Sequence, residues 1–402
     1  MKLRIKPSEA KGSISAPPSK SMAHRLLLCA AMCDGVSVVR GVSSCEDVLA
    51  TLDCIESLGV KYERRGDDIT VWGKDFKETA PTRPLNCRES GSTLRFMIPI
   101  ALLSGKTTLF SGAPSLMSRP MGVYEELCKN KGLTYISDGN SIAVKGRLTG
   151  GEYKLVGNVS SQFISGLLFA LPLCEDDSRI RIVTAIESRS YIDMTIQALR
   201  AFGVIAEWED DHTIYIPGGQ IFGAREISVE GDYSGAAFIE ALNLFSGKVE
   251  VKGLNPESIQ GDRIYRKFYE MLSLGVPTIH IGDCPDLGPV LFAVSSALCG
   301  GIFSGTKRLK IKESDRAKAM AMELSKFGVL VTVHEDAVVV YPADFHAPTE
   351  TLFGHNDHRI VMALSVLLTI TGGEIEGAEV VNKSYPGFFE DIKSLGIEVI
   401  EI

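Results

Sequence analysis

The residues best suited to anion chemistry in this 402-residue chain lie between Arg308 and Arg316, in the run RLKIKESDR. This run contains four cations and two carboxylates. Apolar residues then recur at helical spacing, so we expect a helix whose N-cap is Ser314. Backbone N–H groups at a helix start attract anions, and flanking cations add to that attraction. A solvated, salt-bridged helix start explains the run equally well when it is considered alone.

Cations recur in similar places elsewhere, in polar loops just before or just inside apolar helical patterns. The set is Lys20, Arg25, Arg95, Arg119, Lys312, Arg316, Arg359 and Lys383. The chain has a net charge of -8, so these cations form local clusters on an acidic protein. Such a charge argues against general nucleic-acid binding and favours small ligands that carry several negative charges.

Other polar residues precede apolar helical patterns in the same way. Gly91 permits close approach of the backbone to a ligand, and Ser160, Ser161 and Gln162 offer neutral hydrogen-bonding groups. Asp286 is either the N-cap of the next helix or a general base. The run from His355 to Arg359 contains two histidines but lacks the spacing of a metal site, so we expect no metal.

Bulk properties indicate a two-domain enzyme of ordinary globular composition, 45% apolar and 23% charged. The nine cysteines are scattered, which suits free thiols in a reducing cytoplasm. No signal-peptide pattern opens the sequence, and no apolar run is long enough to span a bilayer.

An internal repeat dominates the sequence. An apolar residue, Gly and another apolar residue follow a helical pattern again and again, with a period of roughly 70 residues and one shorter unit. The repeated glycines are Gly59, Gly132, Gly203, Gly275, Gly328 and Gly396. We expect each to end a helix with a positive φ angle.

Each repeat fits a βαβαββ unit, so the chain is expected to contain six units, three in each of two domains. The fourth unit lacks most of its closing strands, and the N-terminal strand Lys2 to Lys6 has no unit of its own. We therefore place residues 13–228 in an N-terminal lobe and residues 1–12 with 229–402 in a C-terminal lobe. An active site in a cleft between lobes that close on substrate follows from this arrangement.

Taken together, these motifs resemble the 3-phosphoshikimate 1-carboxyvinyltransferase (EPSP synthase) family over nearly the whole chain. The resemblance implies an α/β fold of two inside-out α/β barrel lobes. It also implies transfer of the enolpyruvyl group of phosphoenolpyruvate to the 5-hydroxyl of shikimate 3-phosphate, with release of phosphate, as in aromatic amino-acid biosynthesis. The implied enzyme is a cytoplasmic monomer that uses no cofactor or metal and binds neither nucleic acid nor membrane.

The same resemblance implies a role for each matching residue. The catalytic residues would be Asp286, Glu313 and Lys20, with Asp286 accepting the 5-hydroxyl proton and Glu313 or Lys20 protonating the methylene carbon. Shikimate 3-phosphate would be held by Lys20, Ser21, Arg25, Ser160, Ser161, Gln162, Ser188, Asp286 and Lys312. Phosphoenolpyruvate would be held by Lys20, Gly91, Arg119, Gln162, Arg316, Arg359 and Lys383.

Some positions depart from the family pattern. Glu89 and Arg308 each stand where an Asn is usual, and Ser190 stands where a Pro is usual. Two other functions are alternatives. A UDP-N-acetylglucosamine enolpyruvyl transferase would carry a Cys between Gly112 and Arg119, and this chain has none there. A non-catalytic anion-binding module would not need Asp286, Glu313 and Lys20 together.

Overall fold

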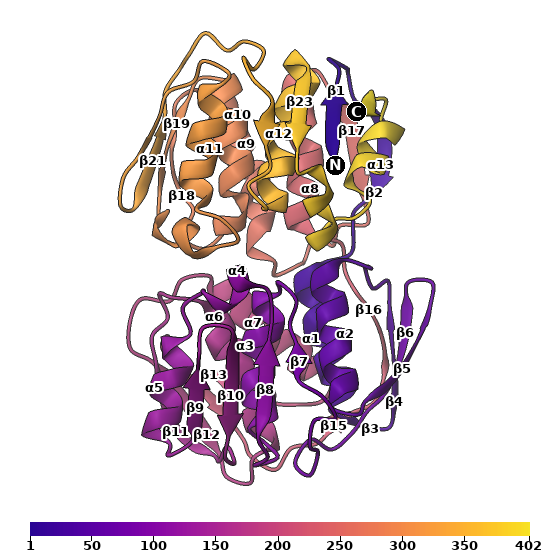
Figure 1. Ribbon diagram of the computed structural model, residues 1–402, viewed down its shortest axis with the longest axis vertical. Coiled ribbons are helices and arrows are strands. Elements are labelled where there is room, and N and C mark those ends of the chain that lie inside the picture. The colour runs from indigo at the N-terminus through magenta and orange to yellow at the C-terminus, as the bar shows by residue number, and fades with distance from the viewer. The chain divides into compact units, whose positions relative to one another are not determined.

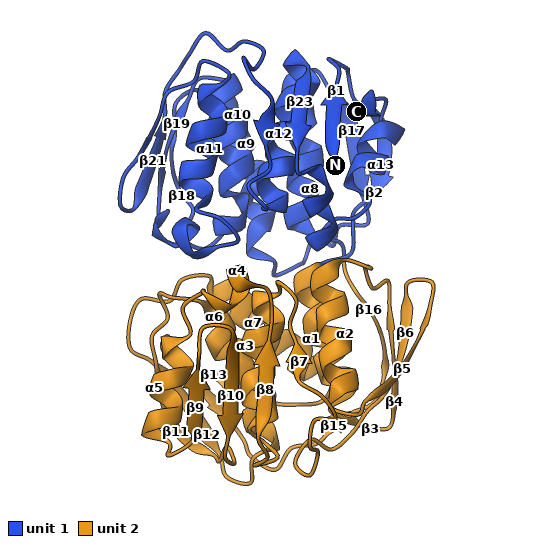
Figure 2. Ribbon diagram, viewed as in Figure 1, with its two compact units in different colours: residues 1–19, 231–402 blue, residues 20–230 orange.

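The computed structural model describes residues 1–402, which form two compact units (Figure 2). The continuous unit is Lys20–Glu230, and the composite unit combines Met1–Ser19 with Gly231–Ile402. The boundary expected after residue 12 falls inside strand β2 (Lys11–Ser15). All of β2 pairs in parallel with β17 (Lys248–Lys252), so its backbone hydrogen bonds hold residues 13–15 in the composite unit.

The continuous unit contains three repeats of helices and strands (Figure 1). Its elements are α1 (Lys20–Ala31), β3 (Cys33–Asp34), β4 (Val36–Arg40), α2 (Glu46–Ser57), β5 (Lys61–Arg65), β6 (Asp68–Trp72), β7 (Leu85–Asn86), α3 (Gly91–Ala101), β8 (Thr108–Ser111), α4 (Pro114–Met117), α5 (Gly122–Asn130), β9 (Thr134–Ser137), β10 (Ser141–Lys145), β11 (Gly151–Leu155), α6 (Ser161–Ala170), the 3-10 turn η1 (Leu171–Leu173), β12 (Ser178–Ile182), α7 (Arg189–Ala201), β13 (Glu207–Trp208), β14 (Thr213–Ile216), β15 (Phe222–Gly223) and β16 (Glu226–Ser228).

The composite unit contains the other repeats. Its elements are β1 (Lys2–Ile5), β2, α8 (Tyr233–Glu240), η2 (Ala241–Phe245), β17, η3 (Gly261–Ile264), α9 (Tyr265–Leu274), β18 (Thr278–His280), η4 (Pro285–Leu287), α10 (Gly288–Ala297), β19 (Gly301–Ser304), η5 (Lys307–Ile311), α11 (Arg316–Ser325), β20 (Val331–Val333), β21 (Ala337–Val340), β22 (Leu352–Phe353), α12 (His358–Thr371), β23 (Gly373–Glu376), η6 (Ala378–Lys383), α13 (Phe388–Ser394) and β24 (Val399–Glu401).

Five four-stranded sheets share one topology, in which a parallel pair is followed by two antiparallel strands. Three belong to the continuous unit, in the orders β16-β4-β6-β5, β7-β8-β10-β9 and β11-β12-β14-β13. Two belong to the composite unit, in the orders β18-β19-β21-β20 and β22-β23-β1-β24. The remaining repeat, which the sequence showed to lack closing strands, contributes only β17 to the two-stranded sheet with β2.

The repeat glycines all have positive φ angles, as the sequence predicted. Their values run from 67° at Gly132 to 155° at Gly275. A left-handed residue after a helix lets the chain turn back at low cost only when it has no Cβ. The period of the glycines therefore reports the period of the helix ends.

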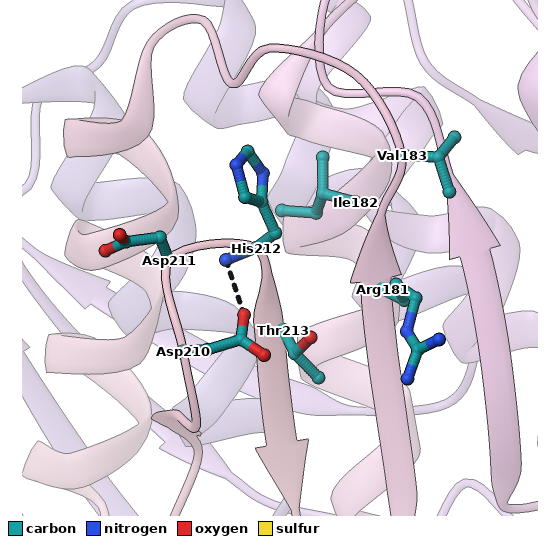
Figure 3. Close-up of a pocket in the computed structure, with 7 residues that line it drawn as sticks. All are labelled: Arg181, Ile182, Val183, Asp210, Asp211, His212 and Thr213. Carbon is teal, nitrogen blue, oxygen red and sulfur yellow. Dashed lines mark hydrogen bonds between the residues drawn. The ribbon is translucent and has the colours of Figure 1, made fainter.

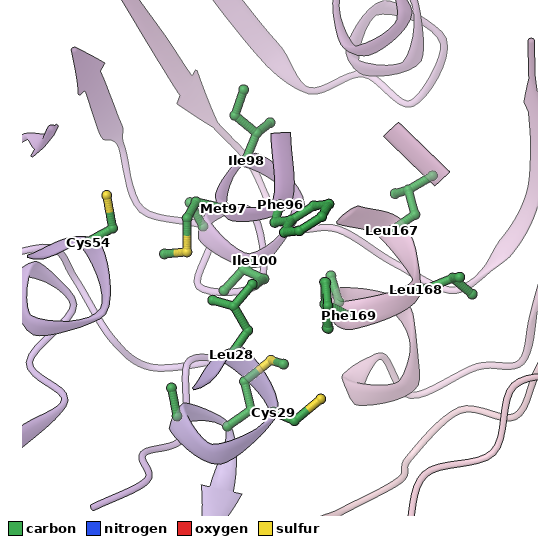
Figure 4. Packing of buried hydrophobic residues seen from close by; sticks show 14 of the residues in the cluster. Leu28, Cys29, Cys54, Phe96, Met97, Ile98, Ile100, Leu167, Leu168 and Phe169 are labelled. Carbon is green, nitrogen blue, oxygen red and sulfur yellow. The ribbon is translucent and has the colours of Figure 1, made fainter. Parts of the chain in front are cut away.

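Helices form the interior of each unit and sheets the outside. Helices α1, α3 and α6 are buried along nearly their whole length, whereas β5 and β6 alternate more and less exposed positions. Figure 4 shows apolar side chains of these three helices packed together, with the rings of Phe96 and Phe169 edge to face at 5.3 Å. The composite unit has its own apolar core around α10 and α12. The fold is thus a two-domain α/β fold with one core per domain. None of its helices has the length and apolar character that crossing a bilayer requires.

We expect Gly166→Ala to destabilise the continuous unit by about 2 kcal/mol, because overpacking of a core costs that order of free energy. Gly166 lies where α6 packs on α3, and an added Cβ would stand 2.2 Å from the Tyr124 hydroxyl and 2.4 Å from the Arg95 carbonyl oxygen. Gly122→Ala is the matched control, since its Cβ would meet no atom within 4 Å. Thermal unfolding measures both variants, and equal melting temperatures for the two would contradict this packing.

Candidate functional site

The start of α3 is the centre of a first group of predicted site residues. A Cβ at Gly91 would lie 2.9 Å from Arg119 Nη1, 3.1 Å from Arg95 Nη1 and 3.8 Å from Gln162 Oε1. Gln162 accepts a hydrogen bond from Arg95 Nη1 at 2.7 Å and donates one to Ser92 Oγ at 2.8 Å. Gly91 therefore allows two guanidinium groups and a helix N-terminus to approach one another, which favours an anionic ligand.

Lys20 joins this group through the start of α2. Its Nζ pairs with Asp47 Oδ2 at 2.7 Å, and both side chains are largely buried. The Asp47 carbonyl oxygen accepts a hydrogen bond from Thr93 Oγ1 at 3.4 Å, which holds the first turn of α2 beside that of α3. The ammonium group that the sequence assigned to both substrates and to proton transfer thus has a fixed carboxylate partner.

A buried chain of hydrogen bonds runs beneath Lys20. His24 Nδ1 and Thr51 Oγ1 lie 2.7 Å apart, Thr51 contacts Thr93 Oγ1 at 2.8 Å, and Thr93 donates to Ser90 Oγ at 2.8 Å. Burial lowers the pKa of His24 well below its usual value, and the nearby Lys20 and Arg25 charges lower it further. The neutral imidazole and the two threonines therefore fix α1, α2 and α3 relative to one another.

Arg25 is a clamp between α1 and α7. Its guanidinium donates to the Ser21 carbonyl at 2.7 Å, to the Tyr191 carbonyl at 2.8 Å and to Thr195 Oγ1 at 2.8 Å. Burial lowers the pKa of Arg25 to about 10, so the group stays charged at neutral pH. Three of its N–H donors thus bond to protein groups and link α1 to α7. The sequence did not indicate this structural role.

The serines predicted to contact shikimate 3-phosphate all lie at helix starts. Ser160 is the N-cap of α6 and accepts a hydrogen bond from the Gln162 N–H at 3.3 Å, and Ser161 is the first residue of that helix. Ser188 precedes α7 with a left-handed φ of 58° and is buried. Backbone N–H groups at helix starts suit phosphate oxygens.

Asp286 is the centre of a second group, in the composite unit. Its Oδ1 accepts hydrogen bonds from Arg316 Nη1 at 2.7 Å and from Lys312 Nζ at 3.2 Å, and its Oδ2 accepts one from Arg359 Nη2 at 2.9 Å. Burial alone would raise the pKa of Asp286, but the charges of Arg359, Lys312 and Arg316 outweigh it and hold that pKa well below its usual range. Burial lowers the pKa of Lys312.

Arg316 joins the second group to two further carboxylates. Its Nη2 donates to Glu313 Oε2 at 2.7 Å, and its Nε donates to Asp357 Oδ2 at 2.8 Å. Arg316 is 1% exposed and Asp357 is 0% exposed, so this charge pair is fully withdrawn from water. Burial opposes the charged form of Arg316, yet Asp357, Glu313 and Asp286 raise its pKa far above the usual value.

Two more predicted cations complete the second group. Arg359 is the second residue of α12, where its backbone N–H donates to the N-cap carboxylate Asp357 at 3.0 Å. Lys383 ends η6 and its Nζ donates to the Asn356 carbonyl at 2.8 Å. The composite unit therefore brings together the predicted residues Asp286, Lys312, Glu313, Arg316 and Arg359, with Lys383 attached through the loop before α12.

One expectation about a cap was wrong. Asp315, not Ser314, is the N-cap of α11 and accepts a hydrogen bond from the Lys318 N–H at 3.3 Å. The Ser314 hydroxyl instead donates to Asp357 at 3.1 Å. Asp286 is not the N-cap of α10, which follows Leu287, and its carboxylate binds cations instead. A general base is the other role that the sequence left open for Asp286.

Sequence reasoning missed Asp47 and Asp357. Each is an acidic residue at the start of a helix, where a carboxylate is common for reasons of capping and dipole alone. Nothing in the local sequence says that one would meet Lys20 from another helix or that the other would bind a buried Arg. Those partners are set by tertiary packing.

The continuous unit also has an open depression at the end of β12 (Figure 3). It is lined by Arg181, Ile182, Val183, Asp210, Asp211, His212 and Thr213. Asp210 accepts a hydrogen bond from the His212 N–H at 2.7 Å and none of the predicted site residues lines the depression. Its lining contains one Arg and two carboxylates, so the depression is a poor match for a ligand with several negative charges.

Comparison with known proteins places these groups in context. Residues 5–392 match the family model of EPSP synthase (3-phosphoshikimate 1-carboxyvinyltransferase). A 3-phosphoshikimate 1-carboxyvinyltransferase of Clostridium kluyveri is 37% identical over 99% of this chain and 98% of its own length. One from Clostridium botulinum is 36% identical over 98% of this chain and 97% of its own.

Solved structures show the same fold. An EPSP synthase from Acinetobacter baumannii superposes with a TM-score of 0.80 at 24% sequence identity. A second structure of EPSP synthase from that organism gives a TM-score of 0.81 at 22% identity. Both comparisons cover 100% of this chain and 100% of the other.

We expect Arg316→Met to destabilise the composite unit by about 3 kcal/mol or more, because it leaves the buried Asp357 carboxylate without its charge partner. Adding Asp357→Asn to Arg316→Met should restore part of the lost stability, because it removes the buried carboxylate charge. The activity of the double variant should stay low. Scanning calorimetry of the two variants tests the pairing. A double variant that melts no higher than Arg316→Met would contradict it.

Proposed function

The chain belongs to the EPSP synthase (3-phosphoshikimate 1-carboxyvinyltransferase) family, and we propose that it transfers the enolpyruvyl group of phosphoenolpyruvate to the 5-hydroxyl of shikimate 3-phosphate. The other product is inorganic phosphate. The observation that carries this proposal is the carboxylate of Asp286 held by three cations beside Glu313. Both substrates carry phosphate and carboxylate groups, which guanidinium groups bind in pairs of hydrogen bonds.

We divide the binding residues between the two substrates as the family resemblance implies. Shikimate 3-phosphate is assigned to Lys20, Ser21, Arg25, Ser160, Ser161, Gln162, Ser188, Asp286 and Lys312. Phosphoenolpyruvate is assigned to Lys20, Gly91, Arg119, Gln162, Arg316, Arg359 and Lys383. Because each substrate draws on both groups, the two units are proposed to close on the substrates, with the reaction taking place between the groups.

Asp286 is proposed to accept the proton of the attacking 5-hydroxyl. With its pKa held far below the usual range, this carboxylate is a weak base while its three cations are attached. Substrate carboxylate and phosphate groups bind the same cations, so they draw Arg316 and Arg359 away from Asp286. Loss of those partners raises the pKa of Asp286, which makes it a better base only when substrate is in place.

Glu313 or Lys20 is proposed to move the second proton. The 5-oxygen bonds to C2 of phosphoenolpyruvate while the methylene carbon C3 takes up a proton, which gives a tetrahedral adduct. Removal of a proton from C3 then restores the double bond, and the C2–O bond to phosphate breaks. Glu313 is held by Arg316 and Lys20 by Asp47, so each acid–base group has a fixed position before substrate binds.

We also propose that the enzyme works in the cytoplasm. All nine cysteines are free thiols and eight of them are buried. Burial raises the pKa of Cys29, Cys87 and Cys284, so these thiols stay protonated and unreactive. A reducing compartment suits a chain that carries this many unpaired thiols.

Phosphate release tests the proposed function directly. The protein is mixed with phosphoenolpyruvate and either shikimate 3-phosphate or UDP-N-acetylglucosamine, and inorganic phosphate is followed over time. We expect release with shikimate 3-phosphate alone. Release only with the nucleotide sugar would make the protein an enolpyruvyl transferase of the other kind, and no release with either would leave an anion-binding protein.

We expect Glu313→Gln to bind both substrates but to turn over at least ~100-fold more slowly, as loss of a general acid–base group does. Gln keeps the shape of the side chain and can still accept a hydrogen bond from Arg316. Glu335→Gln, at an exposed position, controls for the loss of one charge. Calorimetric titration gives the affinities and the phosphate assay gives the turnover; unchanged turnover would remove Glu313 from proton transfer.

A further inference from the structure

The loop that leads into α12 is strained at two adjacent residues. His355 has a φ of 50° and Asn356 a φ of 54°, and neither is glycine. The left-handed conformation is unfavourable for a residue with a Cβ, so surrounding contacts must hold both residues there. The loop is short, because β22 ends at Phe353 and Asp357 already caps α12.

Glu323 provides the contacts at the start of this loop. It lies in the last turn of α11 and its side chain is 1% exposed. Its Oε2 accepts hydrogen bonds from the Phe353 N–H at 3.0 Å and from Lys326 Nζ at 2.8 Å, and its Oε1 lies 2.7 Å from His355 Nε2. Burial alone would raise the pKa of Glu323, but these three donors lower it. The carboxylate is therefore ionised, and His355 Nε2 must be the donor.

The same face of α11 holds both ends of the loop. Arg316 and Glu323 are seven residues apart, which is two helical turns. Arg316 binds Asp357 at one end of the loop, and Glu323 binds Phe353 and His355 at the other. The two left-handed residues lie between these anchors, so the conformation is fixed from both sides.

The conformation of Asn356 determines what the loop offers to the second group. The Asn356 carbonyl accepts the hydrogen bond from Lys383 Nζ, and the next residue, Asp357, caps the helix that carries Arg359. If His355 and Asn356 relaxed to right-handed angles, the Asn356 carbonyl would rotate away from Lys383. The placement of Lys383 and Arg359 thus depends on contacts made by Glu323, a residue that is in neither predicted binding list.

We propose that Glu323 and His355 are positioning residues that hold Arg359 and Lys383 in the arrangement that binds phosphoenolpyruvate. A purely structural tie between α11 and β22 would need only the bond from the Phe353 N–H to Glu323 and the bond from Lys326 Nζ to the Thr351 carbonyl. The bond to His355 adds a direct hold on the strained residue itself. The substrate named here rests on the proposed function, whereas the hold on the loop does not.

Kinetics of Glu323→Gln, His355→Asn and the double variant test the substrate part. In Glu323→Gln, the amide N–H₂ must face some of the donors that Glu323 accepts from, so at least one hydrogen bond is lost. In His355→Asn, the new side chain tolerates left-handed angles but is too short to reach Glu323. We expect each single variant to raise KM for phosphoenolpyruvate ~10-fold, with less than a ~2-fold change in KM for shikimate 3-phosphate. The double variant should be no worse than the singles, because the two residues act through one contact.

Glu240→Gln is the matched control. Glu240 belongs to the same unit and pairs through two hydrogen bonds with Arg266, away from the loop before α12. Its replacement makes the same chemical change, and we expect KM for phosphoenolpyruvate to stay within ~2-fold of the parent value. Equal rises in KM for both substrates, or no rise for phosphoenolpyruvate, would overturn the assignment.

Amide hydrogen exchange tests the hold on the loop without reference to activity. In Glu323→Gln and His355→Asn, the amides of residues 353–361 should exchange ~10-fold faster or more, while those of α10 stay unchanged. Unchanged exchange in residues 353–361 would overturn the positioning role even if KM changed. If the parent protein released no phosphate, the proposed function would fail, and the exchange result alone would decide whether Glu323 and His355 fix the loop.

Discussion

The buried guanidinium of Arg316 is the interaction on which the rest of the composite unit's site depends. A charge that is 1% exposed is stable only if carboxylates surround it, and three do so from three different segments. Asp286 comes from η4, Glu313 from the loop before α11, and Asp357 from the start of α12. The need to neutralise one buried cation therefore brings the proposed base, the proposed acid and the phosphoenolpyruvate-binding cations to one place.

In the continuous unit, mostly neutral polar side chains connect the helices that carry the predicted site residues. His24 of α1, Thr51 of α2, and Thr93 and Ser90 at the start of α3 form a hydrogen-bonded chain that links these three helices. Gln162 ties a fourth helix to Ser92 and Arg95. These polar side chains bond mainly to one another, and Ser90 also accepts a hydrogen bond from the Thr93 N–H at the start of α3. They therefore hold the helices together, and the partial positive charge of the helix starts suits an anionic ligand.

The sequence predicted the repeat and the helix ends at glycine, because both can be read from local patterns of apolar residues and glycine. Gly328, for example, ends a helix whatever lies around it. The hydrogen-bond partners of the residues in each group could not be predicted in this way, because they depend on tertiary packing. Arg25 and Arg95 each lie one turn into a helix and look alike in the sequence, yet Arg25 gives its donors to α1 and α7 whereas Arg95 turns to Gln162. Ser314 and Asp315 are both good caps, and only the presence of Asp357 nearby decided between them.

The first strand of the chain has a consequence for the order in which the protein can fold. β1 pairs with β23 on one side and with β24 on the other, so Leu3 lies opposite both Ile375 and Glu401. That sheet cannot be completed until the last residues of the chain have left the ribosome. The continuous unit needs nothing beyond β16, which pairs with β4, and can be complete while the composite unit is still waiting for its final strand. During synthesis the residues of β1 must therefore stay unpaired without aggregating. In β1, Lys2 and Arg4 alternate with Leu3 and Ile5, so each apolar side chain has a charged neighbour until the sheet forms.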